Sequence, residues 1–236
     1  MSTKLKTLLN QAETETLSAG VIGCKADLQF ALSNRFSADI FEWRVDHLMG
    51  AEVAAGIKKL RRPIILTVRD YDEGGKDNSW DDSQRIDLFH RYANLATMLD
   101  VEAINLSVTE PVIKATRHRF GAGLIVSCHC FEMKGALMKI DNAALSCRNI
   151  RGDILKLACM ADTLDDLQKF TGYYVRTRRR NSFPVAAMAM GKFGKVSRIM
   201  FGLNKTPLIY GFLAKPLVEG QPHVSEIPKL LADYTV

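Results

Sequence analysis

A single lysine, Lys156, lies within the apolar run Ile154–Met160. An ammonium group is costly to bury in such surroundings, and burial beside other positive charges favours the neutral amine. A neutral lysine amine can attack a ketone and form an imine. The run therefore predicts a nucleophilic lysine, while the residues leave open that Lys156 is instead a cation paired with a buried carboxylate such as Glu42.

A second candidate, His129, lies between two cysteines in the run Leu124–Phe131. An imidazole titrates near neutral pH and can serve as a general acid and base, although a hydrogen-bonded core histidine fits the residues equally well. Zinc is disfavoured because side chains alternate along a strand, so Cys128 and Cys130 face away from His129. No second cluster supplies the remaining ligands. The sequence thus favours proton transfer over metal binding.

Charged side chains gather where other apolar runs end. Glu42, Arg44 and Asp46 alternate at the end of one run, which places all three on one face of a strand. Arg69 ends the next run, and Arg198 follows a later one. Clustered arginines bind carboxylates through paired hydrogen bonds, so these residues predict an acidic, hydroxylated ligand. The alternative is internal pairing, for example of Arg44 with Glu42 or Asp46.

A polar loop, Asp70–Asp82, follows Arg69 and contains two adjacent glycines, Gly74 and Gly75. Glycines allow the backbone to bend closely over a ligand, so this loop is a candidate lid. Its Glu73 offers Arg69 an internal partner, which is the alternative to a ligand contact.

Eight short apolar runs recur along the chain, and most of them are continuous rather than alternating. Continuous runs are typical of parallel strands buried on both faces. The predicted strands are Gly20–Lys25, Ile40–Val45, Pro63–Val68, Ala103–Val108, Leu124–Phe131, Ile154–Met160, Pro184–Met190 and Leu208–Leu213. The clearest segments with helical spacing between or after them are Ser83–Leu99, Thr163–Val175 and Ser225–Tyr234.

Eight strands alternating with helices favour a closed (β/α)8 barrel over an open doubly wound sheet in a chain of 236 residues. A barrel of this size forms a single domain, so one domain is predicted for residues 1–236. The C-terminal ends of barrel strands build the active site. The candidate lysine, histidine and arginines all fall at or near such strand ends.

The composition argues against several other classes of function. Lys and Arg exceed Asp and Glu by 32 against 26, but the densest basic run, Arg176–Arg180, lacks the interleaved aromatic residues of a nucleic-acid site. We interpret it as a solvated helix end. Five cysteines without disulfide spacing favour a reducing compartment such as the cytoplasm. We expect neither a signal peptide nor a membrane span, so a membrane is not an expected partner. The character of the basic run makes nucleic acid an unexpected partner as well.

Taken in order, the candidate residues and their neighbours resemble the type I 3-dehydroquinate dehydratases of the shikimate pathway. The resemblance extends from about Gly20 to Ile227, and its specificity comes from the ordered set rather than from any one stretch. The matching stretches are Phe41–Asp46, Pro63–Arg69 with Glu73–Gly75, Ser127–Phe131, Asp153–Ala158, Met190–Lys192 through Ser197–Arg198, and Gly220–Gln221.

The resemblance implies a (β/α)8 barrel without metal or organic cofactor, usually a homodimer, that acts as a carbon–oxygen lyase in aromatic amino acid biosynthesis. It implies that Lys156 attacks the C3 ketone of 3-dehydroquinate and that His129 relays protons while the imine forms and is released. His129 would also take the C2 proton and return it to the departing C1 hydroxyl, which gives 3-dehydroshikimate by syn loss of water. The residues that match substrate-binding positions are Glu42, Arg44, Arg69, Arg198 and Gln221.

Two stretches depart from the family pattern, and the first concerns the fourth strand. In the family this strand ends in an Asp-apolar-Glu pattern whose glutamate orients the catalytic histidine, and the corresponding residues here are Asn105–Ser107. Ser107 cannot supply a carboxylate. This alignment predicts slow turnover because His129 lacks its counter-charge, unless Glu102 or Glu110 compensates.

The second departure lies in the loop that covers the substrate, where the family's Ser-Ala-Pro-Gly-Gln is replaced by Leu217–Gln221. Leu217 removes a hydroxyl contact, and Glu219 adds a negative charge near an anion site. Two hypotheses follow. Retention of Lys156 and His129 favours a dehydroquinate dehydratase that is slow or acts on a related keto acid. The two departures favour a non-catalytic relative that binds a shikimate-pathway metabolite as a sensor or partner subunit.

Overall fold

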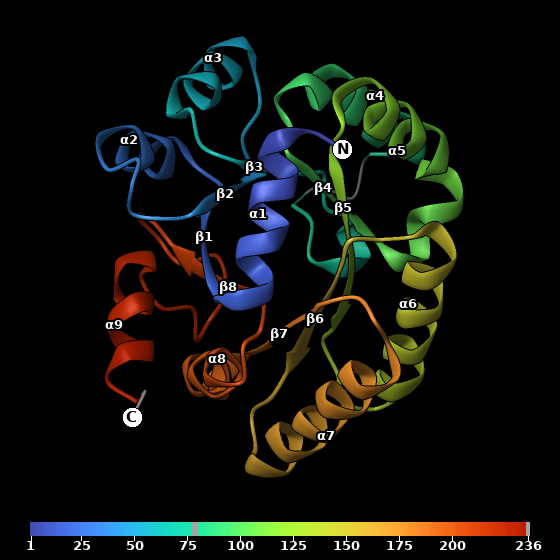
Figure 1. Ribbon diagram of the computed structural model, residues 1–236, viewed down its shortest axis with the longest axis vertical. Coiled ribbons are helices and arrows are strands. Elements are labelled where there is room, and N and C mark those ends of the chain that lie inside the picture. The colour runs from blue at the N-terminus through green and yellow to red at the C-terminus, as the bar shows by residue number, and fades with distance from the viewer. Residues whose placement is uncertain (77–79, 235–236) are drawn as a thin grey trace.

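The computed structural model describes residues 1–76 and 80–234, in which eight parallel strands alternate with helices (Figure 1). The strands are β1 (Leu17–Ile22), β2 (Ile40–Arg44), β3 (Ile64–Thr67), β4 (Met98–Glu102), β5 (Gly123–Cys130), β6 (Ile154–Met160), β7 (Val185–Met190) and β8 (Leu208–Phe212). The α-helices are α1 (Thr3–Thr14), α2 (Lys25–Ser33), α3 (Ala51–Leu60), α4 (Asp82–Tyr92), α5 (Leu106–Phe120), α6 (Ala136–Ile150), α7 (Leu164–Arg180), α8 (Gly194–Leu203) and α9 (Ile227–Ala232). Short 3₁₀ helices are η1 (Tyr71–Glu73), η2 (Ala93–Leu95), η3 (Ala103–Asn105), η4 (Gly191–Phe193) and η5 (Val224–Glu226).

The strands form one sheet in the order β7-β6-β5-β4-β3-β2-β1-β8, and every pair within it is parallel. The two end strands, β7 and β8, approach each other and nearly close the sheet into a barrel. Helices surround the strands on the outside (Figure 1). The predicted single (β/α)8 barrel is therefore confirmed.

Side chains bridge the join between β7 and β8, which we call the seam. Ladder pairing between these two strands is absent from the described part of the chain. Instead, the Ala187 N–H donates to Thr206 Oγ1 at 3.1 Å. Arg198 on α8 donates from Nε to the Tyr210 carbonyl of β8 at 3.1 Å and from Nη1 to the Ala189 carbonyl of β7 at 2.9 Å. Thr206 and Arg198 thus provide bonds that neighbouring strands elsewhere obtain from their backbones.

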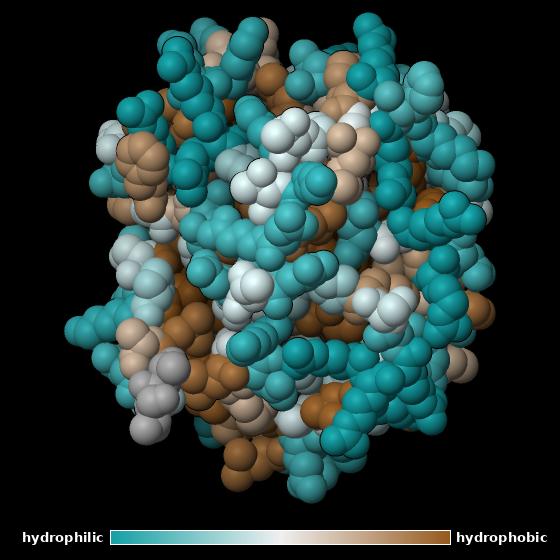
Figure 2. All heavy atoms as spheres, in the orientation of Figure 1, coloured by the Kyte–Doolittle hydropathy of each residue, from teal (hydrophilic) through white to brown (hydrophobic). Residues whose placement is uncertain are grey.

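The barrel interior is apolar at its N-terminal end and charged at its C-terminal end. Helix α1 lies across the N-terminal end and buries Leu5 and Leu8 against the interior apolar cluster (Figure 1). The packing is tight, because a Cβ placed on Gly123 would lie 2.7 Å from Leu5 Cδ1. Hydrophilic side chains cover most of this face of the molecule, which screens the apolar layer from solvent (Figure 2). Within the described residues, no helix is both long and apolar enough to cross a membrane.

The fourth strand departs from its prediction. The sequence predicts it at Ala103–Val108, but β4 is Met98–Glu102 and residues 103–105 form the 3₁₀ helix η3 that leads into α5. In β4, Asp100 and Glu102 alternate with apolar residues and point into the barrel, so the strand lacks the continuous apolar run used to locate it. The apolar residue Ile104 is 62% exposed, so the run that follows is not a buried strand.

Candidate active site

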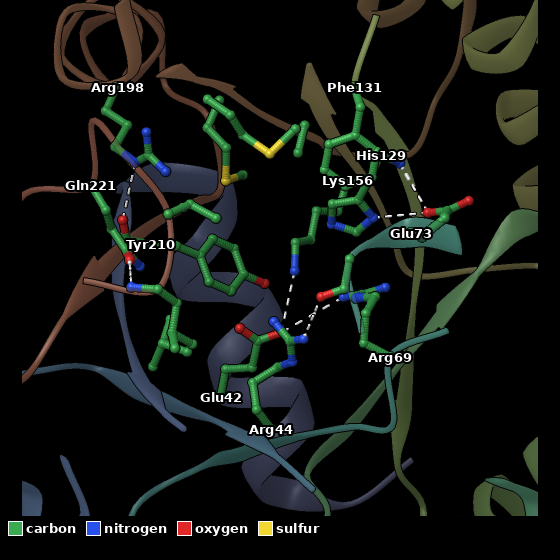
Figure 3. Close-up of a pocket in the computed structure, with 17 residues that line it drawn as sticks. Glu42, Arg44, Arg69, Glu73, His129, Phe131, Lys156, Arg198, Tyr210 and Gln221 are labelled. Carbon is green, nitrogen blue, oxygen red and sulfur yellow. Dashed lines mark hydrogen bonds and ion pairs between the residues drawn. The ribbon is translucent and has the colours of Figure 1, made fainter. Parts of the chain in front are cut away.

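A pocket opens at the C-terminal ends of the strands and encloses about 600 Å³ measured out to its open mouth. All the predicted site residues except Ser107 line it, and several converge on its centre (Figure 3). They are Lys156, His129, Glu42, Arg44, Arg69, Arg198, Gln221 and Leu217, joined by Val21, Glu73, Gly74, Phe131, Ala158, Met188, Met190, Tyr210 and Val218. The sequence-based expectation that the candidate catalytic residues lie together at this end of the barrel is confirmed.

Lys156 projects from β6 into this pocket and is only 4% exposed. Its Nζ lies 2.7 Å from Asp100 Oδ2 and 3.3 Å from Glu42 Oε1 (Figure 3). The pairing with Glu42 considered from the sequence is therefore present, and Asp100 is a closer partner that the sequence reasoning missed. Both carboxylates pair with the amino group in the unliganded protein, and this pairing must be broken before the amine can attack a ketone.

A network of buried ion pairs extends from Lys156 through its carboxylate partner Asp100 to Arg69. Arg69 donates to Asp100 at 2.9 Å and to Glu102 at 2.8 Å. Burial alone would raise the pKa of Asp100, but Arg69 and Lys156 overcome that effect and hold the pKa well below its usual range. The predicted alternative pairing of Arg69 with Glu73 is wrong. Its buried members are three cations and three carboxylates: Arg69, Arg85, Lys156, Glu42, Asp100 and Glu102. At its edge Arg85 also pairs with the more exposed Asp70 and Asp82.

The partner of His129 is Glu73, which η1 carries over the pocket edge. Glu73 Oε2 lies 2.8 Å from His129 Nδ1 and also accepts the backbone N–H of His129 at 2.9 Å (Figure 3). This arrangement fixes the ring and leaves Nε2 as the nitrogen available to a ligand. His129 therefore has a carboxylate partner, contrary to the prediction from the sequence.

The prediction that Ser107 occupies the place of the orienting glutamate is wrong. Ser107 lies in the first turn of α5 with its side chain in solvent, away from the pocket. The Asp-apolar-Glu pattern expected at the end of the fourth strand is present as Asp100-Val101-Glu102, in the observed β4. Because the fourth strand was predicted too late in the chain, the family pattern was aligned with Asn105–Ser107. The argument for slow turnover rested on that alignment and no longer holds.

Burial shifts the pKa values of both His129 and Glu73 away from those of free side chains. It lowers the pKa of His129 well below its ordinary value, and the positive charges of Arg69 and Lys156 add to this effect. It raises the pKa of Glu73 to about 8, although Arg69 acts in the opposite direction. Below that pH the pair holds one proton more, so that Glu73 is protonated toward Nδ1 and the ring hydrogen resides on Nε2. Above it, Nε2 is a free base.

Arg198 is a buried cation with no carboxylate partner in the described part of the chain. It is 3% exposed, and all its hydrogen bonds go to backbone carbonyls, at the seam and at Gly194 and Gly220. Its second amino group, Nη2, makes no hydrogen bond with the described residues. Burial lowers the pKa of this guanidinium to about 10. A positive charge without a counter-ion at a pocket wall is suited to an anionic group of a ligand.

The other pocket arginine, Arg44, already has an internal partner. Its Nε and Nη2 donate to the two carboxylate oxygens of Asp46 at 3.0 and 2.7 Å, as one sequence-based alternative predicts. Nη2 also donates to the Gly74 carbonyl at 3.0 Å. Arg44 therefore ties the loop after β3 to β2 while it lines the pocket. Residues 77–79 of the predicted lid lie outside the described residues, whereas Glu73 and Gly74 line the pocket.

The loop after β8 covers the opposite side of the pocket with apolar side chains. Leu217 lies close to Gly23, where an added Cβ would be 3.0 Å from Leu217 Cδ1, and its N–H donates to Gln221 Oε1 at 3.3 Å. Val218 completes this wall. The expected apolar replacement at Leu217 thus faces the pocket. Glu219 does not line it and is exposed, so its predicted charge near the anion site is not found.

The cysteines beside His129 lie on the other face of β5. Cys128 and Cys130 are buried in the outer core under α6, with their Sγ atoms 3.8 Å apart, while His129 faces the pocket. Side-chain alternation is therefore confirmed. Across residues 1–76 and 80–234, no group of three or more His, Cys, Asp or Glu side chains is arranged to hold a metal ion.

Comparison with known proteins decides the family of this chain. Residues 25–235 match the family model described as Type I 3-dehydroquinase. The chain belongs to the type I 3-dehydroquinase family. Among curated relatives, the 3-dehydroquinate dehydratase of Thermococcus onnurineus is 26% identical over 194 residues, covering 82% of this chain and 86% of that protein. The 3-dehydroquinate dehydratase of Geobacillus thermodenitrificans is 25% identical over 237 residues, covering 93% and 91%.

Solved structures of type I 3-dehydroquinases and their relatives share the fold. The 3-dehydroquinate dehydratase of Aquifex aeolicus superposes with a TM-score of 0.77 at 23% identity, covering 93% of this chain and 99% of that chain. The type I 3-dehydroquinate dehydratase of Clostridium difficile, solved with covalently modified comenic acid, gives a TM-score of 0.75 at 22% identity and covers 92% and 91%. At these identities, the structural similarity supports the barrel fold alone. The family assignment rests on the match to the family model.

Two residues of the pocket lining, Glu73 and Tyr210, and the buried partner of Lys156, Asp100, were not predicted from the sequence. Glu73 was considered only as a partner of Arg69, although its place four residues after that arginine at a strand end puts it over the pocket. Asp100 was missed because the fourth strand was misplaced, and the Asp-Val-Glu pattern itself was the available signal. Tyr210 gave no signal, because a tyrosine in an apolar strand reads as core.

Proposed function

We propose that this chain is a 3-dehydroquinate dehydratase that dehydrates its substrate through an imine at Lys156. The observation that carries the proposal is the meeting of three groups in one pocket: a buried lysine, a carboxylate-held histidine, and the uncompensated guanidinium of Arg198. A cyclic keto acid offers a carboxylate to Arg198 and a ketone to Lys156. Family membership supplies the substrate class.

The chemistry follows from these positions. The Lys156 ammonium loses a proton, its amine adds to the C3 ketone, and the resulting carbinolamine loses water to form the imine. His129 Nε2 then removes a proton from C2, which the imine makes acidic by accepting the electron pair as an enamine. The enamine expels the C1 hydroxyl, which takes the proton from His129 and leaves as water. Hydrolysis of the conjugated imine releases 3-dehydroshikimate and regenerates the lysine.

Glu73 supports both roles of His129. A carboxylate at Nδ1 fixes the ring orientation and the tautomer, so that Nε2 faces the reacting carbons. Asp100 and Glu42 pair with Lys156 before the ligand arrives and then stabilise the cationic imine. We propose Glu42, Arg44, Arg69 and Gln221 as further polar walls for the substrate hydroxyls.

The pH profile should report the His129–Glu73 pair. We expect kcat/KM to rise with pH and level off above about pH 8, because the free protein there loses the proton of the pair and Nε2 becomes a base. Glu73→Gln removes the titrating carboxyl, so its profile should lose this limb. The measurement is the rate of enone formation at low substrate from about pH 6 to about pH 9. A limb near pH 8 that persists in Glu73→Gln would assign the titration elsewhere.

Arg198→Lys should weaken binding of keto acids by about tenfold or more, because a single ammonium group cannot bond the backbone carbonyls that hold Nε and Nη1 and also present a donor to the carboxylate in place of Nη2. A matched ligand pair separates this effect from damage to the seam. 3-Oxocyclohexane-1-carboxylate carries the ketone and the carboxylate, whereas cyclohexanone carries the ketone alone. Trapping each with borohydride over a concentration series gives both apparent affinities. Equal loss for the two ligands would show that Arg198 acts on the fold and not on the carboxylate.

One experiment tests the proposed function directly. The protein is incubated with 3-dehydroquinate, enone absorbance is followed, and the mixture is reduced with borohydride and weighed by mass spectrometry. We expect both absorbance growth and a covalent mass increase. Ligand binding without enone formation would instead favour the alternative, a metabolite-binding protein, for which the apolar wall at Leu217 is the supporting observation.

A further inference from the structure

Tyr210 carries a buried hydroxyl that the protein leaves without a partner. The residue lies on β8, is 3% exposed and lines the pocket. Its Oη has no hydrogen-bond partner among the described residues. Leaving a buried polar group unpaired costs about 1–3 kcal/mol, and native proteins seldom tolerate it without a reason. A group of this kind at a pocket wall points to a ligand atom that satisfies it.

The tyrosine spans the distance between the two proposed anchors of the substrate. Its backbone carbonyl accepts from Arg198 Nε at 3.1 Å, so its main chain adjoins the carboxylate site. Its ring centroid lies 4.2 Å from Lys156 Nζ, so its side chain adjoins the imine site. In Figure 3 the ring extends from the side of Arg198 toward Lys156 and Glu42, and its hydroxyl is at the far end. The hydroxyl therefore lies at the ketone end of any ligand that bridges the two anchors.

The phenol is a hydrogen-bond donor in the neutral range. Burial raises the pKa of Tyr210 well above its ordinary value, and the negative charges of Glu42 and Asp100 add to this effect. A neutral phenol near carboxylates that are already held by Lys156 and Arg69 has a hydrogen to donate and no protein acceptor within reach. A ligand oxygen in the pocket would supply the acceptor.

Part of the pocket lining near Tyr210 is apolar, which restricts the ligand further. Leu217 and Val218, in the loop after β8, and Met188 and Met190, on β7, supply these side chains. A ligand ring held between the anchors thus meets hydrocarbon on one side and a hydroxyl donor beside its ketone. Substituents that are polar next to the ketone and apolar toward Leu217 and Val218 fit this arrangement.

We propose that Tyr210 is a specificity-determining residue whose hydroxyl donates a hydrogen bond to an oxygen substituent on the ring carbon next to the ketone. The inference rests on the proposed function and deepens it, because it narrows the substrate class to cyclic keto acids with an α-hydroxyl. 3-Dehydroquinate and 3-dehydroshikimate both carry a hydroxyl on C4, beside the C3 ketone.

The test compares two ligands in two proteins. 3-Dehydroshikimate has the α-hydroxyl, and 3-oxocyclohexane-1-carboxylate has the ketone and the carboxylate without any hydroxyl. Tyr210→Phe keeps the ring against Lys156 and removes only the oxygen. Borohydride trapping over a concentration series, read by mass spectrometry, gives apparent affinities. We expect Tyr210→Phe to weaken 3-dehydroshikimate about tenfold and to leave the unhydroxylated keto acid within about twofold.

Controls and outcomes separate the inference from the proposed function. Tyr234→Phe, at a residue 61% exposed, should change neither affinity, and thermal unfolding should show Tyr210→Phe at least as stable as the wild type. Equal weakening of both ligands, or no weakening of either, overturns the role of the Tyr210 hydroxyl while leaving the imine mechanism intact. A wild-type protein that traps neither ligand overturns both proposals together.

Discussion

Lys156→Arg is expected to abolish the borohydride-trapped adduct with 3-dehydroquinate or 3-dehydroshikimate and to reduce dehydration to the uncatalysed rate. A guanidinium does not form a stable imine with a ketone, yet it preserves the positive charge beside Asp100 and Glu42. That preservation matters because removing one member of a buried ion pair costs about 3–5 kcal/mol. Mass spectrometry of the reduced protein and the enone assay are the two measurements.

Lys156→Met is the companion variant, and it should also lose the adduct, but with a lower unfolding temperature. Asp100 and Glu42 would then lie buried with Arg69 as the one remaining cation of their ion pairs among the described residues. Lys139→Arg, at a lysine outside the pocket lining, is the matched control and should keep the full adduct. A trapped mass that survives in folded Lys156→Arg would place the imine on another lysine, and peptide mapping would identify it.

His129→Gln is expected to slow dehydration by about 10²–10⁴-fold while leaving an adduct that borohydride still traps. The lysine and both anchors remain, so the imine still forms at equilibrium. What is lost is the base that removes the C2 proton and the acid that protonates the departing hydroxyl. Glutamine retains a polar group that can accept from or donate to Glu73, which limits damage to the pocket edge.

Separating bond formation from proton transfer requires two readouts on the same variant. Enone absorbance gives turnover, and mass after reduction gives the fraction of imine. His118→Gln, at an exposed histidine on α5, serves as the matched control and should behave like the wild type. Full turnover in His129→Gln would exclude this histidine as the proton carrier and would redirect attention to Glu73.

The sequence allowed the barrel and most of the pocket to be predicted because those features are local. Continuous apolar runs mark strands buried on both faces, and Lys156 and His129 each interrupt such a run with a group that is costly to bury. Position at a strand end then places a residue at the active-site mouth. These arguments require no knowledge of what lies across the barrel.

The failures arose where the partner of a residue is far away in the sequence. Asp100 and Glu102 broke the apolar pattern of β4, because they pair with Arg69, which follows β3, and Arg85 on α4 and not with their own neighbours. Glu73 meets His129 across 56 positions of the chain. Hydrophobic periodicity contains no information on such pairings, so one misplaced strand turned an intact site into an apparently defective one.

The same limit applies to Arg198 and Tyr210. Spacing suggested that Arg198 binds an anion, and its hydrogen bonds add a second task at the seam. Whether Arg198 has a carboxylate neighbour depends on the packing of β7, β8 and the loop after β8, which no local pattern encodes. A tyrosine in an apolar strand looks like any core aromatic residue until its hydroxyl is found without a partner.

The seam is the one junction of the barrel that side chains, and not backbone ladders, hold closed in the described part of the chain. Seven junctions between neighbouring strands are closed by repeated backbone bonds, whereas the eighth depends on Thr206 and Arg198. The proposed carboxylate site uses the same guanidinium. A bound acid would therefore hold Arg198 in place and stabilise the closed junction between β7 and β8. Ligand affinity and the free energy of separating β7 from β8 would then be thermodynamically linked. The Ala187 amide, which donates to Thr206 at the seam, should then exchange its hydrogen more slowly when the barrel holds a ligand.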